Sequence, residues 1–443
     1  MHSQSFKSPF IPNTSEDRAS MLAEVGAQSI DELFEDIPSE YRHPELGLPE
    51  PLSEMEVIKK MNSLAIKNLH AGNYLNFLGA GAYQHFCPSV VPFLVTRGEF
   101  LTSYTPYQPE VSQGTLQGTY EFQSITAELF GMEVSNAGMY DGATSLAEAA
   151  LMACRVTKRN QITVLDTVNP RYIDTIRAYA MPQALEVNLV SAENLDLNAD
   201  TSCLISQYPN FYGCIEEMQT LSDLAHSRGA LFVMSCDPIA LAMFKTPGDF
   251  GADIATGEGQ ALGVPLSFGG PYVGIFTCRK DYLRQMPGRI SGKTTDSNGK
   301  TGYVLTLQPR EQHIRRENAT SNICTSTALI ALWATVYSSL MGKHGLRRVA
   351  DLCYQKSHYA ASEIAKLPGY SLVNDRTFFQ EFVVSCPKDF ETTNYGLEKA
   401  GILGGYDVSD KYHNGMLICV TEVATKTDID HLVETLGAIS QNG

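Results

Sequence analysis

The segment YDGATS at residues 140–145 combines a glycine, two hydroxyls and a carboxylate just before a stretch whose apolar residues keep helical spacing. The N–H groups at the start of such a helix, with Gly142 and the hydroxyls of Thr144 and Ser145, would bind an anion such as a phosphate. A helix cap without a ligand would use the same residues. The segment alone leaves both alternatives open.

A carboxylate follows a strand that we expect at residues 230–235. Asp237 comes directly after this strand. In enzymes that use pyridoxal phosphate, an aspartate at such a position keeps the ring nitrogen protonated, which makes the ring an electron sink. Aspartate after a strand is also a common turn residue or helix cap, so Asp237 by itself decides nothing.

The loop at residues 257–265, GEGQALGVP, looks like the lysine loop of a pyridoxal phosphate enzyme, with Gln260 where the lysine should be. A primary amide cannot form the Schiff base that such enzymes need. Lys245 is expected on the next helix or turn and Lys280 beyond a strand at 272–276, so neither reaches this loop. The sequence therefore predicts a cofactor-type site without its reactive amine.

Strands and helices alternate in the middle of the chain. Strands are expected at 161–165, 186–190, 202–207, 230–235 and 253–256, with helices at 171–180 and 216–227. This alternation predicts an α/β fold with a mostly parallel sheet, which binds ligands at the carboxyl ends of its strands. We expect a large α/β domain at residues 70–342. A smaller C-terminal α+β domain at 343–443 would contain strands at 379–384 and 416–421 and a last helix at 427–440.

Residues 1–69 are polar and interrupted by prolines. Helical stretches are expected at 30–34 and 54–69, the second capped by Ser53 with Glu56 three residues later. We interpret this region as a helical arm that wraps a neighbouring chain.

Composition indicates a globular protein without affinity for nucleic acid. The 443 residues are 43% hydrophobic and 19% charged, with a net charge of −16 and a pI near 5.1. The ten cysteines are scattered, without CxxC pairs or a histidine cluster at metal-ligand spacing, so we predict reduced thiols and no metal. Because no signal peptide is evident, we expect a cytoplasmic location. The uncharged stretch 318–342 is rich in hydroxyls and amides, which favours a buried interdomain helix over a membrane span.

The segment GRISGKT at residues 288–294 is similar to a phosphate-binding Walker A loop. That motif requires a glycine at the position of Pro287. We therefore interpret the segment as a mobile basic loop.

Four motifs together resemble one protein family. They are YTPYQPEVSQG at 104–114, YDGATS at 140–145, the glycine-rich run at 257–271 and RENATSNICT at 316–325. With them, nearly the whole chain resembles the alpha subunits (subunit 1) of decarboxylating glycine dehydrogenase, the P-protein of the glycine cleavage system. The last motif commonly contains a lysine where this chain has Asn318, so the role of that lysine is open here.

The resemblance implies fold type I of the pyridoxal phosphate-dependent transferases. It also implies a heterotetramer, α2β2, with a homologous beta subunit that bears the Schiff-base lysine and the cofactor. Such complexes decarboxylate glycine and transfer its aminomethyl group to the lipoyl arm of the H-protein. This chain would be a required but non-catalytic subunit, inactive alone, with Gly142, Thr144, Ser145 and Asp237 as remnants of a cofactor site. The alternatives are a self-sufficient enzyme that uses another lysine, and a pure scaffold.

Two further segments could reach the partner's cofactor site. Thr320 and Ser321, behind Arg315 and Arg316, could complete its phosphate cup in trans, or they could cap a helix expected at 323–340. The second segment could line the entry of that site or pack in the core, and its residues are Tyr104, Thr105 and Tyr107.

Overall fold

The computed structural model describes residues 10–323 and 327–441. It divides into two units, residues 1–68 and 69–443, which we describe separately. The helices of the first unit are α1 (Ser15–Val25) and α2 (Glu54–Ala65), with 3-10 turns at Asp31–Phe34 and Ser39–Tyr41. Ser53 and Glu56 form the predicted capping box of α2. No described residue of this unit is buried within the chain.

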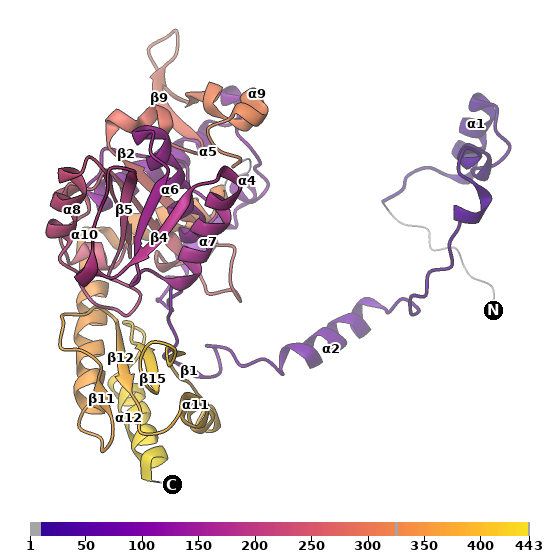
Figure 1. Cartoon of the computed structure of the whole chain (residues 1–443). Coiled ribbons are helices and arrows are strands. Elements are labelled where there is room, and N and C mark those ends of the chain that lie inside the picture. Colours follow the sequence, from indigo (N-terminus) through magenta and orange to yellow (C-terminus); the bar gives the residue numbers. More distant parts are fainter. Residues whose placement is uncertain (1–9, 324–326, 442–443) are drawn as a thin grey trace. The chain divides into compact units, whose positions relative to one another are not determined.

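A seven-stranded sheet forms the centre of the second unit (Figure 1). Its order is β2 (Val134–Ser135), β8 (Gly274–Cys278), β7 (Ile254–Glu258), β6 (Leu231–Cys236), β5 (Thr201–Tyr208), β3 (Gln161–Leu165) and β4 (Glu186–Val190). The five strands from β7 to β4 are parallel, and β8 runs antiparallel to both of its neighbours. The prediction of a mostly parallel sheet is confirmed. Nearly every residue of β3, β5 and β6 is buried, as in strands covered on both faces.

Helices α6 (Gly142–Thr157), α7 (Pro170–Ala180) and α8 (Met218–Ser227) connect these strands. Helix α6 packs against α7 and against β5, β7 and β8, which places its first turn at the carboxyl ends of the parallel strands. Helix α7 begins where the sequence predicts, because Asn169 accepts a hydrogen bond from the backbone of Arg171 and Pro170 fits the first turn. Helix α5 (Gln113–Phe130) contacts β2 and β8.

The long helix α10 (Ala328–Ile364) packs against α5 and also against the smaller C-terminal sheet. It begins five residues later than predicted and continues well past residue 340. Gly342 interrupts it with φ +57° and ψ −179°, a conformation that a residue with a side chain rarely adopts. No helix among the described residues combines the length and apolar character needed to cross a bilayer.

The C-terminal region is an antiparallel sheet covered by helices, as predicted for a small α+β domain. Its strands, in order, are β11 (Ser371–Leu372), β12 (Glu381–Ser385), β15 (Gly415–Cys419) and β14 (Tyr406–Asp407), and its helices are α11 (Phe390–Lys399) and α12 (Lys426–Gln441). Strand β1 (Leu75–Asn76) pairs with β13 (Ile402–Leu403), and Phe77 packs in the C-terminal core. A domain boundary at residues 342 and 343 stays a prediction, since this early segment packs with the C-terminal part.

The Walker-like segment is not a loop. Residues Ile290–Thr295 form β9, which pairs with β10 (Thr301–Thr306) in an antiparallel hairpin. The interpretation as a mobile loop is therefore wrong, and the strand geometry also removes any phosphate cradle. The remaining short helices are α3 (Val90–Val95), α4 (Gly98–Leu101) and α9 (Gln312–Arg315).

Candidate functional site

Three of the segments singled out from the sequence lie at one edge of the large sheet. The first turn of α6, Asp237 after β6 and the loop after β7 lie at the carboxyl ends of the parallel strands. A small cavity between them is lined by Tyr83, Tyr172, Asp237 and Glu258, among others. We call Tyr83, Asp237, Glu258 and Gln260 together the degenerate site.

Gln260 is 1% exposed and makes three hydrogen bonds through its side chain. Its Nε2 donates to the main-chain oxygens of Tyr83 (2.7 Å) and Val264 (2.8 Å), and its Oε1 accepts from the backbone N–H of Tyr83 (2.8 Å). A lysine at this position has three donors and no acceptor, so it could not serve the Tyr83 N–H. The amide thus fixes the segment around Tyr83 inside the site.

The sequence predicts that the N–H groups at the start of α6 could bind an anion, and we call this place the anion seat. In the structure these N–H groups bind carboxylates of the chain itself. Gly142 N–H donates to Glu258 Oε2 (2.8 Å), and Thr144 N–H donates to Asp141 Oδ1 (2.7 Å). The hydroxyl of Ser145 donates to the main-chain oxygen of Asp141 (2.7 Å). Burial raises the pKa of Glu258 to about 8, although its N–H partners pull the pKa down. Two internal carboxyl groups therefore stand where a phosphate would bind.

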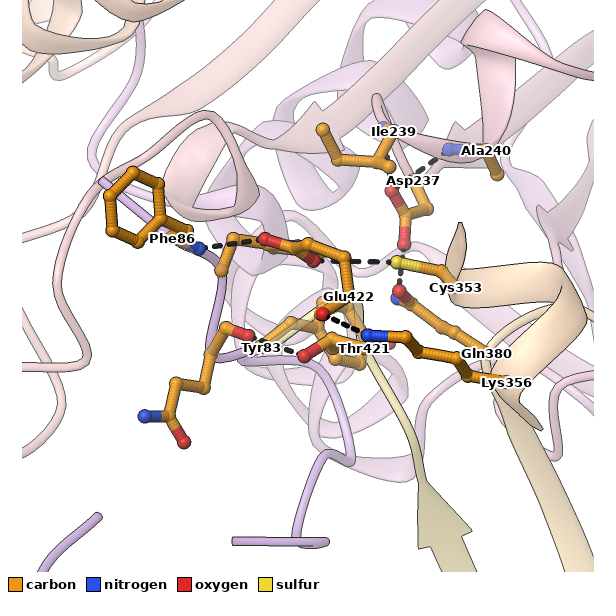
Figure 2. A network of polar contacts seen from close by, with 12 residues as sticks. Tyr83, Phe86, Asp237, Ile239, Ala240, Cys353, Lys356, Gln380, Thr421 and Glu422 are labelled. Carbon is orange, nitrogen blue, oxygen red and sulfur yellow. Dashed lines mark hydrogen bonds and ion pairs between the residues drawn. The ribbon is translucent and has the colours of Figure 1, made fainter. Parts of the chain in front are cut away.

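Asp237 is also fully engaged within the chain. Its Oδ1 accepts from the N–H groups of Ile239 (2.7 Å) and Ala240 (3.3 Å), and its Oδ2 accepts from Gln380 Nε2 at 2.6 Å (Figure 2). Burial raises the pKa of Asp237 above its usual value. Asp237 thus caps the turn at Ile239 and Ala240, and a role beside a cofactor ring stays a prediction.

The cavity left in the degenerate site has a volume of about 30 Å³, enough for one water molecule. Pockets for cofactor-sized ligands measure several hundred cubic ångströms, on the order of 300 Å³ or more. Tyr83 lines this cavity. Its hydroxyl donates to Glu381 Oε2 (2.8 Å), and Ala80 N–H donates to Glu381 Oε1 (2.7 Å). Burial raises the pKa of Glu381 to about 7. The residues present do not fit pyridoxal phosphate.

Sequence reasoning missed three of the residues that close the site. Glu258 lies two positions before Gln260 in the glycine-rich loop, and this unusual carboxylate was a signal that could have been noticed. Tyr83 and Glu381 carry no local signal, because the contacts that bring them here join distant parts of the chain.

Thr320 and Ser321 lie on a second, larger cavity of about 530 Å³, which Glu148, Arg155 and Tyr179 also line. The Ser321 hydroxyl donates to Glu148 Oε1 (2.6 Å), and burial raises the pKa of Glu148 despite this bond. Since α10 begins only at Ala328, neither residue caps it, and that alternative is wrong. The last two residues of the RENATSNICT motif, 324 and 325, lie outside the described residues.

One alternative predicted that Tyr104 and Tyr107 pack in the core, but both side chains are exposed. Tyr104 is 78% exposed and lines a mainly apolar cavity of about 380 Å³ with Thr105, Leu101 and Leu332. The Tyr107 hydroxyl accepts from Arg289 (3.1 Å). This exposed aromatic surface is open to another chain.

Comparison with known proteins identifies the family of this chain. A family model described as the glycine cleavage system P-protein matches residues 8–436. The chain belongs to the P-protein family. Two similar P-proteins, from Thermomicrobium roseum and Desulforamulus reducens, are each named probable glycine dehydrogenase (decarboxylating) subunit 1. Both are 49% identical to this chain, with alignments covering 96% and 97% of it and 98% and 100% of the relatives.

A crystal structure of a glycine decarboxylase (P-protein) in inhibitor-bound form is 41% identical, with a TM-score of 0.93 over 98% of this chain and 100% of that one. More distant structures share the fold alone. A sphingosine-1-phosphate lyase from Burkholderia pseudomallei (13% identical, 91% and 94% covered) and a NifS-like protein (12%, 83% and 99%) both have a TM-score of 0.63. The prediction of the fold type I architecture for this P-protein is confirmed.

Proposed function

We propose that this chain is the non-catalytic subunit of a two-subunit, glycine-decarboxylating P-protein. The observation that supports the proposal is Gln260, a buried amide in the loop that resembles a lysine loop, beside a cavity of only about 30 Å³. The P-protein family depends on pyridoxal phosphate, which supplies the electron sink for decarboxylation when bound. A partner subunit with the missing lysine would hold it.

The name "subunit 1" of the relatives supports the existence of such a partner. We propose a homologous, lysine-bearing beta subunit in an α2β2 assembly, which transfers the aminomethyl group of glycine to the lipoyl arm of the H-protein. Pseudo-twofold pairing of homologous chains would turn the same surface of this chain toward the partner's site. The exposed Tyr104 and Tyr107 could then line the entry of that site.

Within this assembly, we propose that Thr320, rather than Ser321, contacts the phosphate of the partner's cofactor. The Ser321 hydroxyl already donates to Glu148, whereas Thr320 lines the open cavity and follows the exposed Arg315 and Arg316. A hydroxyl bond to a charged phosphate contributes on the order of 1.5–3 kcal/mol. Thr320→Ala should therefore weaken cofactor binding by the complex about tenfold or more.

Fluorescence titration of the reconstituted complex with pyridoxal phosphate measures this affinity. Thr435→Ala, on α12 and outside both cavities, serves as the control. Sedimentation checks that assembly is unchanged. Equal cofactor affinity of the Thr320→Ala and wild-type complexes would refute the trans contact.

The proposed function itself is tested by mixing. The isolated chain should show no absorbance band of bound cofactor and should release no carbon dioxide from labelled glycine. The mixture with the lysine-bearing partner should show both. Activity of the isolated chain would support the self-sufficient alternative. A partner that is fully active without this chain would leave only the scaffold alternative.

A further inference from the structure

Three metal-binding side chains meet in the interior beside the degenerate site. His85 lies on the segment after β1, Cys353 on α10 and Glu422 just after β15, so the sequence gives no spacing that links them. The side chains of His85 and Glu422 are 1% and 8% exposed, and Cys353 is buried. None of the three belongs to the contacts that close the degenerate site around Gln260.

The distances are close to those of a coordination sphere. His85 Nδ1 lies 2.7 Å from Glu422 Oε2, and Cys353 Sγ lies 3.5 Å from the same oxygen. The three ligand atoms lie within 4.8 Å of one another. Zinc bond lengths of about 2.0–2.3 Å in a tetrahedron separate ligand atoms by roughly 3.4–3.6 Å. The sulfur–oxygen pair already has this separation, and the nitrogen–oxygen pair must open by less than about 1 Å. The nitrogen–sulfur pair, which lies within 4.8 Å, must close by up to about 1.2 Å.

The surroundings hold the ligands in place. Glu422 Oε1 accepts from the backbone N–H of Phe86 (2.7 Å), and Lys356 donates to the main-chain oxygen of Glu422 (Figure 2). Such outer hydrogen bonds orient a ligating carboxylate. Imidazole, thiolate and carboxylate are all zinc ligands, and one thiolate with one carboxylate balances the charge of a divalent ion in a buried place.

The two ring nitrogens of His85 differ. Nδ1 faces Glu422 and is the atom that would bind the ion, in exchange for its present contact with the carboxylate. Nε2 is buried and has no hydrogen-bond partner among the described residues, so it does not compete for the carboxylate. We propose that His85, Cys353 and Glu422 form a binding site for one divalent zinc-like ion, with a water as the fourth ligand.

Binding would form one bond from each side chain to the ion, release the thiol proton of Cys353 to solvent and leave the ion's oxidation state unchanged. Because the three ligands come from the early segment, α10 and the C-terminal domain, the ion would link these parts. The site would therefore stabilise the fold and take no part in the chemistry of glycine.

Cobalt titration of the full-length chain, purified under reducing conditions and treated with a chelator, tests the proposal. We expect one Co²⁺ per chain with a thiolate-to-cobalt charge-transfer band, displacement of cobalt by Zn²⁺, and a higher melting temperature with either metal. Cys353→Ser should abolish the band and weaken binding at least about 100-fold. The matched control is Cys386→Ser, another buried cysteine of this chain, which should retain both.

Glu422→Gln is the second variant, since its amide oxygen can still accept from Phe86 while it loses the charge that the ion needs. Circular dichroism checks that each variant folds. Absence of the band in the saturated wild-type chain would overturn the proposal, as would an equal band in Cys353→Ser. The result does not depend on glycine decarboxylation, so the proposed function stands or fails separately.

Discussion

Gln260 has two donors and one acceptor in use, and each finds a matching main-chain partner. Its replacement by lysine would leave the Tyr83 N–H facing a buried ammonium. Because Glu258 also occupies the anion seat, a new amine would have no phosphate site beside it. The contacts that close this site are therefore not confined to one side chain.

The substitution Gln260→Lys should accordingly lower stability and still give no decarboxylase activity. We expect the free energy of unfolding to fall by about 2–4 kcal/mol, since a buried charge and an unsatisfied N–H are created together. The isolated variant should still release no carbon dioxide from labelled glycine. Denaturant unfolding and the exchange assay measure these results, with exposed Gln117→Lys on α5 as the control. Decarboxylation by the variant alone would show that the lysine was the only missing part.

The raised pKa of Glu258 predicts that the stability of the chain depends on pH. Burial raises its pKa from 4.5 to about 8, so the folded state binds a proton that the unfolded state has already released. Between these values the folded state holds more protons, and stability falls as pH rises from about 4.5 to about 8. The full effect is on the order of a few kcal/mol.

The variant Glu258→Gln cannot titrate, so its unfolding free energy should decline less between pH 5 and pH 8.5 than that of the wild-type chain. Buried Glu381 still contributes to the remaining slope, because its pKa is also raised, to about 7. Urea unfolding at several pH values gives both slopes, and exposed Glu121→Gln is the control. Identical slopes for Glu258→Gln and wild type would exclude a protonated Glu258.

At the scale of elements, most of the sheet followed from local patterns. The buried strand β3 is a short β-branched run, β6 is almost entirely apolar, and α7 carries its own cap and proline. The hairpin of β9 and β10 was missed because its strands are polar and glycine-containing. The closure of the degenerate site was missed because Tyr83 and Gln260 are 177 residues apart. Local sequence does not encode such long-range contacts.

Helix α10 carries a backbone feature that can be tested directly. Gly342 has φ +57° and ψ −179°, which is strained for any residue with a Cβ, although no atom lies within 4 Å of an added Cβ. Gly342→Ala should lower the free energy of unfolding by about 1–3 kcal/mol. Gly114 in α5 has the same free space without positive φ, so Gly114→Ala should be neutral or stabilising by up to about 1 kcal/mol. Urea unfolding compares the two. Equal effects would mean that α10 continues regularly through Gly342.

At the scale of the whole molecule, the N-terminal unit buries no described residue of its own. Large apolar side chains are exposed along α2, including Met55, Val57, Ile58 and Met61. Contiguous exposed apolar surface of this kind commonly marks an interaction site. That the arm wraps a neighbouring chain stays a prediction, and it agrees with a function in an assembly.

We expect the partner subunit, and never this chain, to hold the cofactor of the complex. Borohydride reduction after incubation with pyridoxal phosphate, followed by peptide mass mapping, tests it on the isolated chain and on the reconstituted complex. We predict a stoichiometric pyridoxyl adduct on one lysine of the partner subunit and none on this chain, Lys245, Lys280 and Lys356 included. A stoichiometric adduct on a single lysine of this chain would contradict the account.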